Sequence, residues 1–372
     1  MTTLPHSLLP AVVGHAQNRK WAYPPRLPTS NPPPRPSRAD LSPALEDGSM
    51  CACLCTCLLV ACALVVAAFV FRHVVVRGKQ CTSQARLGGK TVIVTGSNTG
   101  IGKMTAIDLA RRGARVILAC RSRERGEAAL ADVKRVRPDH SQVVFMQLDL
   151  GSLKSVRSFA ETFLRTEPRL DLLINNAGVY MQGRTEDGLG MMFGVNHVGH
   201  FLLTHLLLDR LKQCGPSRVV NVASLAHNFG TIDFDCLTKH KALGLETSST
   251  RVFKIYSDSK LCNVLFTHEL AKRLEGTKVT CYSLHPGAIR SELARNTSWV
   301  LQLLIVPMTA FFFKNTVQGA QTTLHCALQE GIEPLTGRYF SNCTVRELYP
   351  KAKDDAAAKK LWELSERLCG LA

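Results

Sequence analysis

The chain lacks the close cysteine and histidine pairs that build metal sites. Its 14 cysteines include no C-x-x-C pair, and no paired histidines accompany them. Structural zinc sites need such pairs of ligands, and dense disulfide frameworks belong to short secreted chains. The sequence therefore argues against a metal centre and a disulfide scaffold. Reduced thiols in a domain that faces the cytosol are expected instead.

The chain also lacks a basic stripe interleaved with aromatic residues, although its formal net charge is +17. Lysine and arginine are scattered along the sequence, whereas a nucleic-acid interface gathers them on one face. We therefore expect no nucleic-acid partner. A basic, solvated surface of this kind is favoured beside anionic lipid head groups.

Charge is absent from Cys51 to Phe71, a stretch long enough as a helix to cross a bilayer core of about 30 Å. A secretory signal peptide would have a shorter apolar region and a small-residue cleavage site. Arg72, Arg77 and Lys79 follow the stretch, which favours a cytosolic C-terminal side. The sequence thus predicts one transmembrane helix over 50–72, in the endoplasmic reticulum membrane, with the lipid bilayer as a partner.

The first 49 residues show no helical or alternating periodicity and are rich in proline, which predicts a disordered tail. Met50 stands directly before the apolar stretch, and one hypothesis makes it the true initiator, so that residues 1–49 are absent from the mature protein. The stretch itself holds five cysteines. Palmitoylation at the membrane edge and packing as small apolar residues within the helix both stay open for Cys51, Cys53, Cys55, Cys57 and Cys62.

From about residue 85 to the C-terminus, short apolar runs alternate with helical stretches. The predicted strands are Thr91–Thr95, Arg115–Cys120, Gln142–Leu148, Leu170–Ile174, Arg218–Ala223, Lys278–Leu284 and Arg338–Phe340. Strands separated by helices indicate a doubly wound parallel sheet with both faces covered. We therefore predict a single α/β domain over 85–372, Rossmann-type with three α/β/α layers.

Three glycines lie between the first strand and the helix that follows it, in Thr95-Gly96-Ser97-Asn98-Thr99-Gly100-Ile101-Gly102. Glycine permits the tight turn, the approach of the backbone to a pyrophosphate and close helix–strand packing. The helix then offers free N–H groups and a positive dipole end to phosphate. The spacing predicts a dinucleotide site whose contacts are Gly96, Ser97, Asn98, Gly100, Ile101 and Gly102.

No carboxylate ends the second strand, where an NAD-binding protein usually has one for the ribose 2′-hydroxyl. The residues there are Cys120 and Arg121. A guanidinium can pair with a 2′-phosphate through two hydrogen bonds. The sequence therefore predicts NADP(H) as the cofactor, with Arg121 on the phosphate.

A tyrosine and a lysine lie four residues apart in Tyr256-Ser257-Asp258-Ser259-Lys260, so they share one face of a helix. The free phenol has a pKa of about 10. A neighbouring cation stabilises the phenolate, and we expect Lys260 to bring the pKa of Tyr256 toward neutrality. Ser224 ends the fifth predicted strand, where its hydroxyl can steady a substrate oxygen.

These motifs, in this order, resemble the short-chain dehydrogenase/reductase superfamily over about residues 85–370. The resemblance implies that Asp149 hydrogen-bonds the adenine and that Asn176, in Asn175-Asn176-Ala177-Gly178, lines the adenosine side. It also implies that Asn196 holds a water linking Lys260 to bulk solvent. The segment expected to hold the nicotinamide amide contains Pro286, Gly287, Ile289 and Ser291.

Longer runs, among them L-A-C-R-S and Y-S-D-S-K-L-C-N-V-L-F, are similar to the retinol dehydrogenase branch of that superfamily. The branch implies oxidoreductase activity on retinal and retinol, with Tyr256 exchanging a proton and NADP(H) a hydride. A steroid or fatty-aldehyde reductase is the alternative within the family. A membrane-bound scaffold without activity is the alternative outside it.

Trp299–Phe313 is strongly apolar, shorter than a membrane span and interrupted by Pro307. In the resembling family this place holds the variable substrate lid, so an apolar small molecule entering from the bilayer is expected. A buried core helix is the other interpretation. Two glycosylation sequons, at Asn296 and Asn342, should stay empty in a cytosolic domain. The oligomeric state stays open, a homo-oligomer included.

Overall fold

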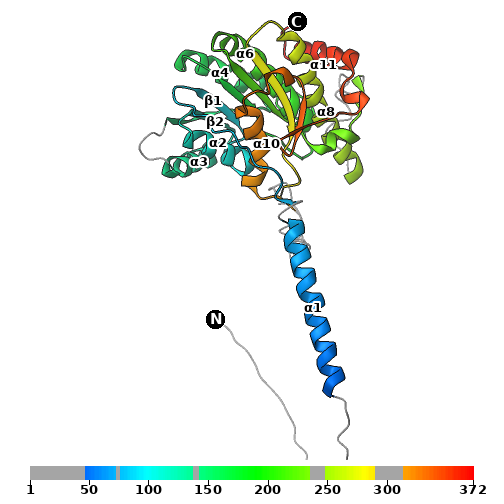
Figure 1. Ribbon diagram of the computed structural model, residues 1–372. Helices are drawn as coiled ribbons and strands as arrows, with labels where there is room; N and C mark the ends of the chain where they lie inside the picture. The colour runs from blue at the N-terminus through cyan, green and yellow to red at the C-terminus, as the bar shows by residue number, and fades with distance from the viewer. Residues whose placement is uncertain (1–46, 73–75, 137–141, 235–247, 290–312) are drawn as a thin grey trace, which may run out of the picture. The chain divides into compact units, whose positions relative to one another are not determined.

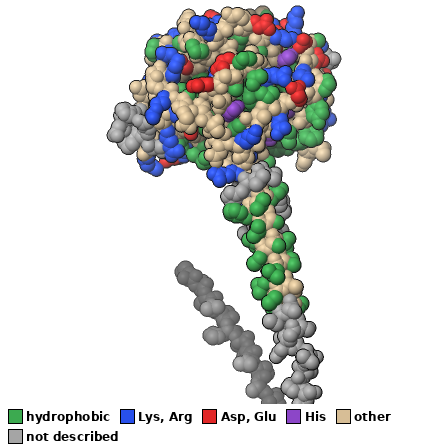
Figure 2. Space-filling view, viewed as in Figure 1, with side chains coloured by type: hydrophobic (Ala, Val, Ile, Leu, Met, Phe, Trp, Pro, Cys, Tyr) green, Lys and Arg blue, Asp and Glu red, His purple; other side chains and the backbone are tan. Residues whose placement is uncertain are grey.

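The structure is a computed structural model that describes residues 47–72, 76–136, 142–234, 248–289 and 313–372 (Figure 1). Helix α1, Asp47–Phe71, contains the charge-free stretch, and its side chains from Cys53 to Phe71 are not buried in protein. Figure 2 shows hydrophobic side chains along this helix. A long apolar helix without a protein cover suits a lipid surround. Most of the predicted tail lies outside the described residues.

A second apolar helical stretch, Met191–Gln213, is also long enough to cross a membrane, but it is 78% buried. Its hydrophobic side chains belong to the core of the α/β body, so it is a core helix of that body. Among the described residues, α1 is therefore the candidate membrane span.

The α/β body is built on an eight-stranded sheet in the order β3-β2-β1-β4-β5-β6-β7-β8. Seven strands are parallel, and β8 pairs with β7 in the antiparallel sense. The doubly wound prediction is confirmed, while the short strand β8 was not predicted. The strands are β1 Thr91–Thr95, β2 Arg115–Cys120, β3 Val143–Gln147, β4 Leu172–Asn175, β5 Ser217–Val222, β6 Val279–His285, β7 Tyr339–Ser341 and β8 Thr344–Arg346.

Helices cover both faces of the sheet, as the alternation of apolar strand residues requires (Figure 1). Ile93 of β1 packs in one apolar core, whereas its neighbours Val92 and Val94 pack in the other. The first core includes α4 Leu153–Thr166, α6 Gly199–Gln213, α8 Ser249–Arg273 and α11 Asp355–Leu368. The second includes α2 Gly100–Arg111, α3 Arg123–Val136 and α10 Thr316–Leu328.

Short helical segments complete the body at the edges of the sheet. They are α5 Met191–Phe193, η3 Gly194–Val198, η4 Leu225–Phe229, η6 Glu333–Leu335 and η7 Pro350–Ala352. The order of the strands changes direction at β1, which has β2 on one side and β4 on the other. In open parallel sheets, ligands bind beyond the carboxyl ends of the strands at such a switch point.

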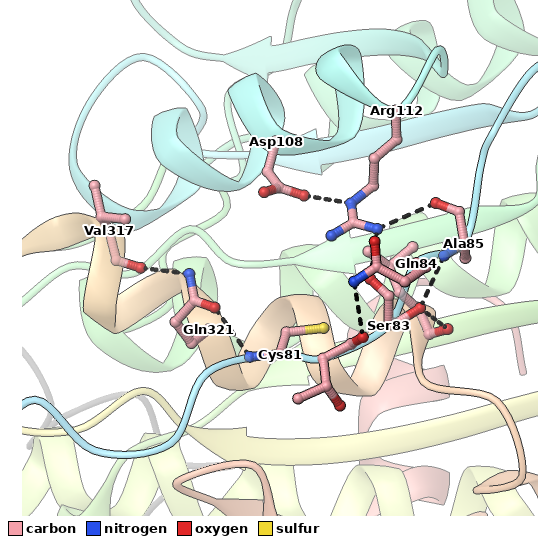
Figure 3. Close-up of polar contacts among 10 residues, drawn as sticks. Cys81, Ser83, Gln84, Ala85, Asp108, Arg112, Val317 and Gln321 are labelled. Carbon is pink, nitrogen blue, oxygen red and sulfur yellow. Dashed lines mark hydrogen bonds and ion pairs between the residues drawn. The ribbon is translucent and has the colours of Figure 1, made fainter.

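The backbone of the segment before β1 is tied to side chains of Arg112, which follows α2, and of Gln321 in α10 (Figure 3). The N–H of Cys81 donates to Oε1 of Gln321 in α10 at 3.0 Å. Arg112, at the end of α2, donates to the carbonyls of Ser83 at 2.8 Å and Ala85 at 3.1 Å. Because α2 opens on the glycine-rich loop, this segment supports the helix that carries the predicted cofactor site.

The same segment contacts the turn between β7 and β8. Oδ1 of Asn342 accepts from the N–H of Lys79 at 2.8 Å and from Nζ of Lys314 at 3.3 Å. Asn342 is one of the two predicted sequons, and a glycan on its amide would disturb both hydrogen bonds. The other sequon, at Asn296, lies outside the described residues, as does most of the apolar run Trp299–Phe313.

Candidate active site

The three glycines after β1 have different surroundings. A Cβ on Gly96, whose φ is +64°, would lie 2.9 Å from Cα of Ala177, and one on Gly102 would lie 2.4 Å from Nδ2 of Asn176. Gly100 has a φ of +59°, but a Cβ there would meet no atom within 4 Å. Gly96 and Gly102 therefore allow close packing on the turn after β4. Gly100 borders open space, where a phosphate can approach the backbone.

Thr95 joins the glycine-rich loop to the Asn-Asn-Ala-Gly turn. Burial lowers the pKa of His200 to about 3, so its ring is neutral. Nδ1 of that ring lies 3.1 Å from the carbonyl of Asn196 and must donate to it, so Nε2 accepts from the Thr95 hydroxyl at 2.9 Å. The hydroxyl oxygen in turn accepts from the N–H groups of Asn176 and Ala177, each at 2.9 Å. The polar side-chain groups of Thr95 and His200, on which the loop rests, are thus all hydrogen-bonded.

Ser97 has a buried hydroxyl with no hydrogen-bond partner among the described residues, and the predicted contact Asn98 lies half-buried beside it. A buried polar atom without a partner costs stability. A ribose or phosphate oxygen would satisfy the hydroxyl, so these residues fit a dinucleotide. Ile101 lies near Ile289, since a Cβ on Gly319 would be 3.2 Å from Ile101 Cγ1 and 2.9 Å from Ile289 Cδ1.

The end of β2 carries the two residues predicted to choose the cofactor. Cys120 is buried, which raises the pKa of its thiol to about 11 and keeps it neutral. Arg121 is exposed, and its guanidinium makes no ion pair with the residues that the structure describes. Asp149, after β3, accepts from the N–H of Gly151 at 2.9 Å and keeps its second oxygen available. The place of a cofactor-binding carboxylate at β2 is thus taken by a neutral thiol.

The segment after β6 turns back toward α10. Pro286 is buried, and Gly287 has a φ of +100° in a position where a Cβ would lie 2.7 Å from Cδ of Lys314. Ile289 pairs with Lys314 as a parallel β-bridge. The structure thus places Pro286, Gly287 and Ile289 at the carboxyl end of β6, as predicted. The remaining predicted contact, Ser291, lies outside the described residues.

Tyr256 and Lys260 lie on α8, next to Ser224 at the end of β5. Nζ of Lys260 is 5.8 Å from the centre of the Tyr256 ring and donates to the carbonyl of Val222 at 3.1 Å. Ser224 Oγ accepts from the N–H of Ala226 at 3.2 Å, and the Ser224 hydroxyl lies close enough to the Tyr256 phenol to lower its pKa. The structure therefore brings a phenol, a hydroxyl and an ammonium together, as the sequence predicted.

The pKa values differ from the expected pattern. Burial raises the pKa of Tyr256, the nearby Ser224 hydroxyl opposes that shift, and repulsion between the phenolates of Tyr256 and Tyr180 adds to it. The predicted lowering by Lys260 is therefore wrong for the protein alone, because burial outweighs the groups that lower the pKa of Tyr256 and Lys260 is not among them. Burial also lowers the pKa of Lys260 to about 8, so its charge titrates near physiological pH.

Asn196 lies in η3, a π-helical turn before α6. Its Oδ1 accepts from the N–H of Val179 at 2.8 Å, while its Nδ2 donates to the Val179 carbonyl at 3.1 Å and to Ser259 Oγ at 3.0 Å. A Cβ on Gly178 would lie 3.2 Å from Lys260 Nζ and 3.6 Å from Asn196 Oδ1. The side chains of Asn196 and Lys260 therefore both lie beside Gly178. The water predicted to link Lys260 to bulk solvent stays a prediction.

Comparison with known proteins agrees with this arrangement. The family model for short chain dehydrogenases matches residues 90–236. The bovine protein Dehydrogenase/reductase SDR family member 13 is 52% identical over 84% of this chain and 82% of its own length. Human Retinol dehydrogenase 12 is 51% identical over 79% of this chain and 90% of its own length. This chain belongs to the short-chain dehydrogenase family.

A solved structure supports the fold of this short-chain dehydrogenase. An uncharacterised protein from Mycobacterium paratuberculosis superposes with a TM-score of 0.62 and 34% identity, covering 79% of this chain and 98% of that one. The family assignment makes the chain an oxidoreductase, and the resemblance to the retinol dehydrogenase branch is confirmed. Among the described residues, no group of three or more His, Cys, Asp or Glu side chains is placed to hold a metal ion.

Reasoning from the sequence missed two residues of this short-chain dehydrogenase that lie at the site. The ring of Tyr180 lies 5.2 Å from that of Tyr256, nearly perpendicular to it at 76°. Its position two residues after Gly178 was the available signal. Lys314 is buried against Gly287, and burial lowers its pKa. Nothing in the sequence around Lys314, which directly follows an apolar run, indicates that it packs against Gly287.

Proposed function

We propose that the chain is an NADP(H)-dependent, membrane-anchored oxidoreductase that interconverts an apolar carbonyl compound and its alcohol, with retinal and retinol as the substrate pair. The observation that carries the proposal is the convergence of Ser224, Tyr256 and Lys260 beside the glycine-rich loop. This arrangement supports acid–base chemistry on an oxygen whose carbon exchanges a hydride.

The residues would act as follows. Ser224 donates a hydrogen bond to the substrate oxygen, and Tyr256 gives that oxygen its proton during reduction or removes it during oxidation. The charge of Lys260 favours the phenolate left after proton donation. A bound nicotinamide cofactor supplies or accepts the hydride.

The proposed cofactor contacts follow the elements around β1. The phosphates would lie over Gly96 and the N–H groups opening α2, with Gly100, Ile101 and Gly102 framing them. Ser97, Asn98, Asp149 and Asn176 would hold polar groups of the adenosine half. Pro286, Gly287, Ile289 and Ser291 would hold the nicotinamide, with the side chains of Tyr256 and Lys260 near its ribose.

The preference for NADP(H) is supported by the neutral Cys120 and the exposed Arg121. The double variant Cys120→Asp with Arg121→Ala should repel a 2′-phosphate and shift the ratio of affinities for NADPH and NADH toward NADH. Two charge-assisted hydrogen bonds are worth about 1.5–3 kcal/mol each, so a shift of at least tenfold is expected. An unchanged NADPH affinity would overturn the cofactor assignment.

The retinoid is supported by identity to human Retinol dehydrogenase 12. The test is NADPH oxidation by membranes carrying the full chain, with all-trans-retinal, medium-chain aldehydes and ketosteroids offered in parallel. Fastest turnover of retinal supports the proposal. Preference for an aldehyde or a steroid would establish the alternative substrate class. Binding of NADPH without turnover of any carbonyl would favour the non-catalytic scaffold.

Membrane anchoring through α1 is supported by its charge-free, unburied stretch Cys53–Phe71. The basic residues after Phe71 support a body in the cytosol, and we propose the endoplasmic reticulum as the membrane. Protease added to intact microsomes should then digest the body. Protection of the body, or glycan on either sequon, would reverse the orientation.

A further inference from the structure

Exposed hydrophobic side chains of the α/β body are concentrated around Tyr256. Outside α1, eight large hydrophobic side chains of the described residues are exposed, and two of them, Phe313 and Val317, lie at the start of α10. We call the other six the apolar rim: Tyr180, Met181, Leu225, Phe229, Phe253 and Tyr349. Exposed apolar side chains scattered singly need no explanation, but a contiguous group marks a contact surface.

The apolar rim is continuous with the proposed catalytic groups. Leu225 directly follows Ser224, and Phe253 lies one helical turn before Tyr256 on the same face of α8. The rings of Phe253 and Phe229 are 5.7 Å apart. An apolar path therefore leads from the phenol to Phe229, which is 63% exposed.

A cavity lies at the outer end of this path, between η4 and η7. Its volume is about 520 Å³, and its lining is Leu225, Asn228, Phe229, Tyr349, Pro350 and Lys351. Nζ of Lys351 donates to the carbonyl of Asn228 at 2.7 Å and so ties the two walls together. Small-molecule pockets commonly measure about 300–1,000 Å³ and are mostly apolar with a few polar groups.

A second cavity, of about 240 Å³, differs in both lining and place. Charged side chains, including Lys272, Glu275 and Arg338, make much of its wall. It lies at the C-terminal end of α8, about 18 Å beyond Tyr256 at 1.5 Å per residue. A hydrophobic ligand reacting at Tyr256 would therefore extend into the cavity between η4 and η7.

We propose that the apolar rim and this cavity bind the hydrocarbon chain of the substrate, which is an elongated molecule with its carbonyl or alcohol at one end. The inference rests on the proposed function, because it places the reacting oxygen at Tyr256. Each methylene that leaves water on the rim raises kcat/KM by roughly threefold to fourfold. Side chains of η4, η7 and α8 thereby determine which substrate chain length gives the highest kcat/KM.

A series of straight-chain aldehydes tests the rim in the full chain, reconstituted in membranes with NADPH. For Phe229→Ala and Tyr349→Ala, the ratio of kcat/KM for dodecanal to that for butanal should fall about tenfold relative to the unsubstituted chain. Val317→Ala, which removes an exposed apolar side chain on the other face of the sheet, is the matched control and should leave the ratio unchanged. Equal ratios in all four proteins would overturn the inference.

A second measurement separates the rim from the proposed function, since it needs no turnover. A long-chain alcohol bearing a photoreactive diazirine at its far end is irradiated with the full chain, and the labelled peptides are identified by mass spectrometry. Label within 225–229 and 349–351 supports the rim even where no aldehyde is reduced. Label confined to α1 or to the other face of the sheet contradicts the rim, whatever the enzyme activity.

Discussion

The two sides of Tyr256 are built in different ways. On the cofactor side, backbone groups of β1 and β4 meet through Thr95 and His200, and glycines permit contacts that no side chain would allow. On the substrate side, exposed aromatic and aliphatic side chains border an open cavity. In the proposed function, backbone groups around the glycine-rich loop would hold the cofactor phosphates, whereas exposed side chains would bind the substrate. Substitutions on the cofactor side should therefore weaken cofactor binding, whereas substitutions on the substrate side should change substrate specificity.

The largest effect is expected at the junction of the two sides. Tyr256→Phe removes the proton donor but keeps the ring, so turnover should fall by about 10²–10⁴-fold. NADPH affinity, measured by cofactor fluorescence, should stay close to that of the unsubstituted chain. Turnover retained in this variant would contradict the assignment of Tyr256.

On the cofactor side, a single added methyl group should be enough to disturb the glycine-rich loop. A Cβ on Gly102 would lie 2.5 Å from the carbonyl oxygen of Gly96, so Gly102→Ala must displace the glycine-rich loop. Overpacking of this kind costs about 1–3 kcal/mol. We expect a lower thermal unfolding midpoint and a weaker NADPH affinity, by roughly tenfold or more.

The matched control is Gly88→Ala, because a Cβ on Gly88 meets no atom within 4 Å and its backbone is not left-handed. Both the unfolding midpoint and the NADPH affinity should be unaffected in this control. If Gly102→Ala had the same unfolding midpoint and NADPH affinity as Gly88→Ala, close backbone packing at Gly102 would not be required for cofactor binding.

The smallest predicted effect is on the pH profile, and it sharpens the comparison because both sides share Lys260. Its pKa is lowered to about 8 by burial, so the ammonium is charged below that pH and neutral above it. Carbonyl reduction should therefore slow by at most about tenfold between pH 7 and pH 9 as the cation beside Tyr256 is lost. Lys260→Arg keeps the charge, and its residual activity should not decline over this range. A flat profile from pH 7 to 10 in the unsubstituted chain would argue against a role for the ammonium.

The fold could be predicted largely because local patterns agree with the tertiary structure. The strands Thr91–Thr95 and Arg115–Cys120 are confirmed at both ends, since apolar β-branched runs bounded by charged residues and glycines define them. Strand β8 escaped prediction because its three residues depend on the left-handed turn at Asn342 and Cys343. The docking of Cys81 and Ser83 on α10 and α2 depends on partners more than 25 residues away and has no local signal.

The site was predictable to the extent that it rests on motifs. The structure places Tyr256, Lys260 and Ser224 together as the sequence predicted. Neither the raised pKa of Tyr256 nor the positions of Tyr180 and Tyr349 followed from the sequence. The pKa of Tyr256 depends on its burial, and the positions of Tyr180 and Tyr349 depend on packing between segments that are distant in the sequence.

The most direct test of the account follows the hydride itself. The full chain in membranes is given all-trans-retinal and NADPH carrying deuterium at the transferable C4 position, and the retinol formed is analysed by mass spectrometry. We predict retinol that carries one deuterium on its hydroxyl-bearing carbon, with formation almost abolished in Tyr256→Phe. Unlabelled retinol, or equal formation in both proteins, would contradict hydride transfer at a site in which Tyr256 moves the proton.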